Sequence, residues 1–302
     1  MSFGQWKTVA KWGWVSAVLI FISYYASTKF VIIKKSVAIL SPPTIVLAVC
    51  AIVLAKCCLS INMRFAASKA GLCISMKDSY CIYNRTQLAK YIPGSIWQFV
   101  GRMVILRERG ASPAAIRDSL LAEHAWIVGS AALLGVVLVL FSRPDLVEYW
   151  VNKVGITKAV YAAILIVAFL FSLLILFMLM WNKFAYWLLR LLPSVRALIV
   201  LSMTWVFMGI AFWVILGPFW VTPVPFLYAV GIYCIAWVVG FLVPFAPAGL
   251  GVREGILVFA MSPFLPVETA ILLSAINRVL CFFSELILVI PCVANRRAFR
   301  LE

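Results

Sequence analysis

The sequence predicts an all-α polytopic membrane protein, and three observations predict it. Apolar residues make up 65% of the 302 residues and charged residues only 12%, against roughly a half and a quarter in soluble domains. A soluble globule of this size has too little interior to bury so much apolar surface. The apolar residues also gather in runs of about the 20 residues that a bilayer-spanning helix needs. A soluble enzyme, a disordered chain and a disulfide-stapled secreted domain are therefore excluded.

The first two apolar segments cover residues 12–33 and 42–61, and a strongly basic region follows them. The first segment is too long for a signal peptide and has no small-residue cleavage site after it, so we expect an uncleaved span. Between Arg64 and Arg117 only Asp78 and Glu108 oppose the basic side chains. The positive-inside rule therefore places this region in the cytoplasm.

Further apolar segments bring the expected total to about eight, and basic residues follow the fourth and the last of them. If the short segment 249–265 crosses the membrane, both termini are cytoplasmic, and we expect a bacterial cytoplasmic (inner) membrane protein. Lys29, Lys34 and Lys35 would then lie outside, which leaves the orientation of the first hairpin open. The six further segments are 119–141, 158–181, 197–216, 226–245, 249–265 and 267–292.

Several function classes lack their sequence signals. The net charge of +16 fits cytoplasmic loops and anionic headgroups, and no stretch could form a nucleic-acid-binding module, so no nucleic-acid partner is expected. The eight cysteines form no C-x-x-C pair, and neither a metal nor a cofactor is predicted. We find no G-x-S-x-G, H-E-x-x-H, Walker or D-x-D motif, so no enzymatic activity is predicted.

Two segments, 90–102 and 244–255, are interrupted by proline and glycine at matching places in the chain. Each has a Gly followed within two residues by Arg, and each precedes a proline, Pro113 or Pro266, that opens a long apolar run. The likeness predicts an internal, inverted repeat with halves 1–150 and 151–302 inside one transmembrane domain, 1–302. Whether 83–109 and 249–265 re-enter or span the membrane is left open.

Interrupted helices of this kind predict a central anion-binding cavity. The N-terminus of a half-helix presents free N–H groups and suits a phosphate. Irregular backbone at membrane depth is tolerated only where protein or a water-filled cavity surrounds it. The candidate substrate-binding residues lie in the two interrupted segments and the last apolar run: Pro93, Gly94, Trp97, Gln98, Gly101, Arg102, Gly249, Gly251, Arg253, Glu254, Asn277, Arg278 and Glu285.

The charged members of this set allow two interpretations. Arg278 and Glu285 are seven residues apart, so they share a helix face and could flank Arg253 and Glu254. They form either a structural ion-pair network or a headgroup or proton site. Trp97 and Gln98 are either ordinary interfacial residues or contacts to a lipid chain or sugar.

Glu123 and His124 near the start of a predicted span are a second candidate. His124 is the only histidine. The pair serves either capping and interfacial packing or a proton relay, because histidine titrates near neutral pH.

The stretches Lys90-Tyr91-Ile92-Pro93-Gly94, Trp97-Gln98 and Gly101-Arg102, together with 247–255, resemble the two signature regions of the lysylphosphatidylglycerol synthase transmembrane region, or flippase-like domain family. The resemblance covers about residues 10–295. It implies that a lipid is moved between leaflets. The chain ends at Glu302 without the aminoacyltransferase domain of the two-part synthases, so lipid lysylation is not expected. The resemblance implies these cavity-lining residues: Pro93, Gly94, Gln98, Gly101, Arg102, Gly249, Gly251, Arg253 and Glu254.

The sequence therefore predicts a translocase for a phosphate-bearing lipid, such as a phospholipid or a polyprenyl-linked sugar, with anionic membrane lipids as its binding partners. One alternative is a non-transporting partner of envelope-polysaccharide or lipid-glycan biosynthesis proteins. Another is an integral-membrane enzyme that acts on a lipid-linked substrate, with Glu123, His124, Glu254 or Glu285 as acid or base.

Overall fold

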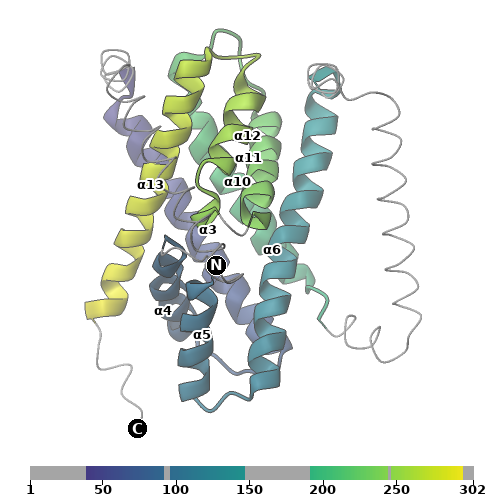
Figure 1. Ribbon diagram of the computed structural model, residues 1–302, viewed down its shortest axis with the longest axis vertical. Helices are drawn as coiled ribbons and strands as arrows, with labels where there is room; N and C mark the ends of the chain where they lie inside the picture. The colour runs from purple at the N-terminus through teal and green to yellow at the C-terminus, as the bar shows by residue number, and fades with distance from the viewer. Residues whose placement is uncertain (1–38, 92–95, 147–190, 244–245, 295–302) are drawn as a thin grey trace, which may run out of the picture.

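The computed structural model describes residues 39–91, 96–146, 191–243 and 246–294, and the regular structure of these residues is entirely helical (Figure 1). The expected segments 12–33 and 158–181, and the candidates Pro93 and Gly94, lie outside the described residues. Four helices are long: α3 (Pro42–Lys69), α6 (Pro113–Ser142), α10 (Val195–Leu216) and α13 (Val267–Ala294). The shorter elements are α4 (Met76–Gln87), η1 (Leu88–Tyr91), α5 (Trp97–Glu108), η2 (Gly217–Phe219), α11 (Phe226–Leu242), η3 (Pro247–Gly249) and α12 (Val252–Met261).

The four long helices are apolar enough and long enough to cross a bilayer, which supports an integral membrane protein. The apolar helix α11 is shorter, with 17 residues. Segment 249–265, whose crossing of the membrane the sequence left open, forms the helix α12 of only 10 residues. At a rise of about 1.5 Å per residue it reaches roughly half of a 30 Å hydrocarbon core, so it is not a crossing by itself.

The long helices begin where serine and proline make helix starts favourable. Ser41, Ser112 and Ser194 precede α3, α6 and α10, and each hydroxyl accepts a hydrogen bond from a backbone N–H in the first turn. These bonds satisfy donors that a helix start leaves free. Pro42 and Pro113 occupy the first turn of α3 and α6, where a missing N–H costs nothing.

Close helix packing depends on small residues at the contact faces. Helices α6 and α11 approach so closely at Gly135 and Gly231 that a Cβ on Gly231 would lie 2.8 Å from Val139 Cγ2 and 3.0 Å from the Gly135 carbonyl oxygen. Helix α3 packs along α10, and its buried alanines include Ala51 and Ala55. Small residues at such faces let membrane helices gain van der Waals contact without a bulky side chain between them.

Two hairpins, each a short helix followed by a long one, run in opposite directions. Figure 1 shows α5 running from the middle of the bundle to its lower end before α6 returns upward, and α12 running toward the upper end before α13 returns downward. The segments before the two short helices meet, because η1 contacts η3. The internal repeat itself stays a prediction, but this placement brings both interrupted segments to one site.

Candidate functional site

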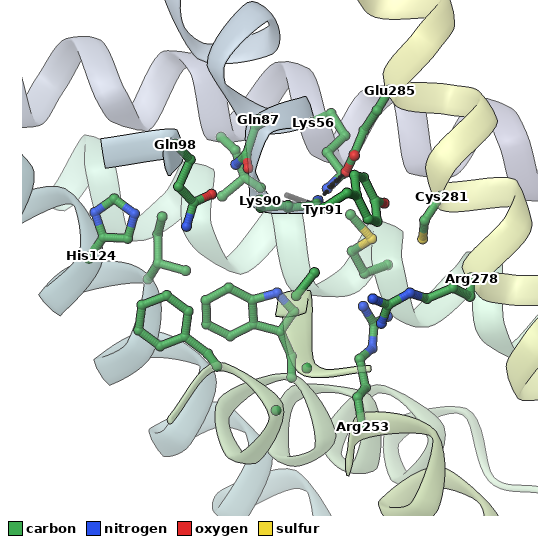
Figure 2. Close-up of a pocket in the computed structure, with 18 of the residues that line it drawn as sticks. Lys56, Gln87, Lys90, Tyr91, Gln98, His124, Arg253, Arg278, Cys281 and Glu285 are labelled. Carbon is green, nitrogen blue, oxygen red and sulfur yellow. Dashed lines mark hydrogen bonds and ion pairs between the residues drawn. The ribbon is translucent and has the colours of Figure 1, made fainter. Parts of the chain in front are cut away.

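A cavity of about 270 Å³ lies where the two interrupted segments meet (Figure 2). Its walls include Lys56 from the middle of α3, Trp205 from the middle of α10 and Tyr233 from the middle of α11. Gln98 comes from the first turn of α5 and Gly249 from η3. Because the spanning helices contribute their central turns, the cavity lies near the middle of their length, the depth at which transporters with broken helices bind their substrates.

Four cations border the cavity: Lys56, Lys90, Arg253 and Arg278, which we call the cationic cluster. Glu285 borders it too. Its Oε1 lies 2.7 Å from Lys56 Nζ and also accepts a hydrogen bond from Lys90 Nζ. Glu285 is 1% exposed, and its Oε2 has no hydrogen-bond partner among the described residues. One carboxylate thus serves two lysines.

Lys90 lies in η1, outside the four spanning helices, and its environment makes its charge adjustable. Burial lowers the pKa of Lys90 to about 8; Glu285 opposes this effect, and the nearby Lys56 adds to it. Desolvation and a like charge both disfavour the ammonium form. Lys90 is therefore charged at neutral pH but can lose its proton under mildly basic conditions, unless an anion stabilises the charged form.

The two arginines of the cluster differ in their partners. Arg278 Nη1 lies 2.9 Å from Glu254 Oε1, and Glu254 Oε2 accepts a 2.8 Å hydrogen bond from the Gly251 N–H at the start of α12. Arg253 has no carboxylate partner among the described residues. Its guanidinium carbon lies 4.4 Å from the centroid of the Tyr233 ring, and its buried Nη2 makes no hydrogen bond. Arg253 Nη2 is thus a buried donor of the cluster without a partner among the described residues.

The backbone before α12 explains the glycines of the second interrupted segment. Gly249 and Gly251 have φ values of +71° and +82°, which favour glycine. A Cβ on Gly249 would also lie 2.9 Å from backbone atoms of Gly240 in α11. The turn therefore packs directly on α11, and α12 begins beside the cavity with Arg253 in its first turn.

The structure corrects the role expected for Arg102. Its side chain is 0% exposed and does not border the cavity; Nη1 lies 2.5 Å from Glu123 Oε1, and Nε donates to Thr86 Oγ1. The guanidinium also lies over the Tyr83 ring. Arg102 faces α4 and α6 because the Glu123 carboxylate lies there, so this pair ties α5 to its neighbours.

The candidate residues fall into two groups, those that line the cavity and those that do not. The structure brings six of them to the cavity: Gln98, His124, Gly249, Arg253, Arg278 and Glu285. The remaining described candidates are not part of its lining: Trp97, Gly101, Arg102, Glu123, Gly251, Glu254 and Asn277. Trp97 is exposed, Gly101 packs against Thr86, and Asn277 is buried.

Glu123 and His124 do not act as a pair in this arrangement. Glu123 forms an ion pair with Arg102, whereas the His124 ring borders the cavity. His124 Nδ1 lies 2.9 Å from the Leu120 carbonyl oxygen, which can only accept, so Nδ1 carries the proton. In the neutral ring Nε2 is then an acceptor.

Sequence reasoning missed Lys56 and the full part played by Lys90. Lys56 interrupts the apolar run 42–61, and a single charge inside a span is itself a signal of a functional site. Within the described ranges no group of three metal-binding side chains comes together. No protein-family model matches the chain, and neither does any curated protein.

Proposed function

We propose that this protein is a lipid translocase that holds the phosphate of a lipid headgroup in the central cavity. The observation that carries the proposal is the excess of positive charge there. Among the described residues, four cations border the cavity, and counting Glu254 behind Arg278 they face only two carboxylates. A ligand with negative charge would complete the site.

The energetics favour an anionic ligand. A charged side chain at the membrane centre costs about 2.5–3.5 kcal/mol on insertion scales, and a cation without a counter-charge keeps that cost. Arg253 has a free Nη2 at the cavity, and a planar guanidinium binds phosphate oxygens in a bidentate manner. Lys56 and Lys90 both bind Glu285. A ligand phosphate can therefore bind Lys90 while Glu285 keeps its ion pair with Lys56.

The surroundings of the cavity favour a lipid as the carrier of that phosphate. Large apolar side chains are exposed along one face of α6, among them Leu133, Val137 and Phe141, as expected for contact with acyl chains. The oppositely directed hairpins α5–α6 and α12–α13 bracket the site. Rocking of one hairpin against the other would expose the cavity to each leaflet in turn, which agrees with the resemblance to the flippase-like family.

Membrane placement follows from charge in the same proposal. Arg107 lies in the last turn of α5, Arg109 follows in the turn between α5 and α6, and Arg117 lies in the first turns of α6. The positive-inside rule makes the end of the bundle with this turn cytoplasmic. We place the protein in a bacterial cytoplasmic membrane on this basis.

Reconstitution into liposomes tests the proposal. The probes are fluorescent phosphatidylglycerol and a fluorescent prenyl phosphate, and a membrane-impermeant quencher reports the fraction in each leaflet. The wild type is expected to speed equilibration of at least one probe. Arg253→Gln is expected to slow it about tenfold or more, because it removes the free phosphate donor. Arg117→Gln, an exposed and remote control, is expected to match the wild type. Equilibration of both probes at the protein-free rate would overturn the proposal.

A further inference from the structure

The cavity has a second, chemically different side that the cationic cluster does not explain. Figure 2 shows Gln98 and His124 at one side and Arg253, Arg278 and Glu285 at the other, with Gln87 between them. The side with Gln98 and His124 is lined by aromatic rings and amide groups. No lysine, arginine or carboxylate borders this side among the described residues.

The rings on this side form a continuous surface, which we call the aromatic wall: Trp205, Trp237, Phe241, His124 and Phe99. Trp237 and Phe241 are stacked with centroids 5.2 Å apart and planes 8° apart. Phe241 stacks on His124, and His124 lies 4.6 Å from Phe99, centroid to centroid. An aromatic face carries negative charge density, so it attracts the slightly positive C–H groups on the face of a sugar ring.

Polar side chains stand beside the aromatic wall, and one of them has a buried atom without a partner among the described residues. The Gln87 amide donates to the Tyr83 hydroxyl, but its buried Oε1 has no partner among the described residues. The Gln98 side chain is 8% exposed and borders the cavity. His124 adds an acceptor at Nε2 in its neutral form. An acyl chain would leave the buried Gln87 Oε1 unsatisfied, which is unfavourable, whereas the hydroxyls of a sugar can both donate and accept.

From this juxtaposition we infer that the ligand is a lipid whose phosphate carries a sugar, with the phosphate on the cationic cluster and the sugar ring against the aromatic wall near Gln98. The inference rests on the proposed function and names the substrate class of the same site. The cavity volume of about 270 Å³ approaches the lower end of the range for small-molecule sites, so room remains beyond a phosphate group.

Calorimetric titration of the full-length protein in detergent tests the inference. Two probes with the same chain and the same single negative charge are compared: farnesyl phosphoryl glucose and farnesyl methyl phosphate. For the wild type we expect the glucosyl lipid to bind at least tenfold more tightly. Gln98→Leu and, separately, Trp237→Leu should reduce this ratio below threefold while leaving the affinity for farnesyl methyl phosphate within twofold. Arg253→Gln should weaken both probes by a similar factor.

The outcomes separate the inference from the proposed function. Equal affinity of the wild type for the two probes would overturn the sugar assignment and leave the phosphate site standing. A preference for the glucosyl lipid that survives in Gln98→Leu would show that the sugar binds elsewhere and would also overturn it. Absence of binding for both probes would overturn the phosphate site itself. Gln98→Leu preserves side-chain size, so the test stands even if Trp237→Leu does not fold.

Discussion

Replacing Arg253 by glutamine should weaken ligand binding and stabilise the unliganded protein. Arg253 has no counter-ion in the described structure, and its main compensation is the Tyr233 ring 4.4 Å away. A central charge costs about 2.5–3.5 kcal/mol, and a cation–π contact returns roughly 0.5–2 kcal/mol. Arg253→Gln should therefore stabilise the unliganded protein by about 0.5–3 kcal/mol. Loss of a charge-assisted hydrogen bond worth about 1.5–3 kcal/mol should weaken phosphate binding about 10- to 150-fold.

Thermal unfolding in detergent and titration with farnesyl methyl phosphate measure the two effects. Arg102→Gln is the comparison variant, because it removes a fully buried guanidinium whose carboxylate partner is in place. Breaking a buried ion pair costs about 3–5 kcal/mol, so Arg102→Gln should lower the unfolding temperature and leave the affinity of the folded protein unchanged. The reasoning is refuted if Arg253→Gln destabilises the protein as much as Arg102→Gln does, or if it binds the probe as tightly as the wild type.

Three further predictions concern the Arg102–Glu123 ion pair, the turn at Gly249 and the titration of Lys90. Replacing Arg102 and Glu123 together by Met and Leu should recover most of the stability lost in either single variant, as a double-mutant cycle by thermal unfolding would show. Gly249→Ala should lower the unfolding temperature, because its positive φ and the backbone of Gly240 leave no room for a Cβ; Gly110→Ala, which meets no neighbour within 4 Å, isolates the effect of positive φ. Probe affinity should fall as pH rises through about 8, because Lys90 loses its charge, and Lys90→Arg should remove that pH dependence; a flat wild-type profile between pH 7 and 9.5 would count against Lys90 as a ligand.

The sequence predicted the long helices well, because length, apolar content and capping are local properties. Pro113 opens α6 as expected, preceded by the Ser112 cap. It also predicted that two interrupted segments share a cavity, and the structure does bring Gln98 and Arg253 to the same one. Whether segment 249–265 crosses the membrane stayed open, because apolar content alone does not reveal that the helix ends at Met261.

The sequence could not predict which charged side chains would pair in the folded protein. Arg102 and Arg253 follow similar motifs, yet Arg102 meets Glu123 from α6, while Arg253 meets no carboxylate in the part of the chain that the structure describes. Nothing local to either motif encodes that difference, since it depends on which helix faces each guanidinium. For the same reason the pairing of Lys56 with Glu285, 229 residues away in the chain, could not be predicted.

The most direct measurement is an experimental structure of the protein with farnesyl methyl phosphate in a lipid nanodisc. Our account predicts density for the phosphorus atom between Arg253 and Lys90, with the Glu285 carboxylate retaining Lys56. Density for the phosphate only at the basic turn between α5 and α6, with the cavity still lacking it, would contradict the account.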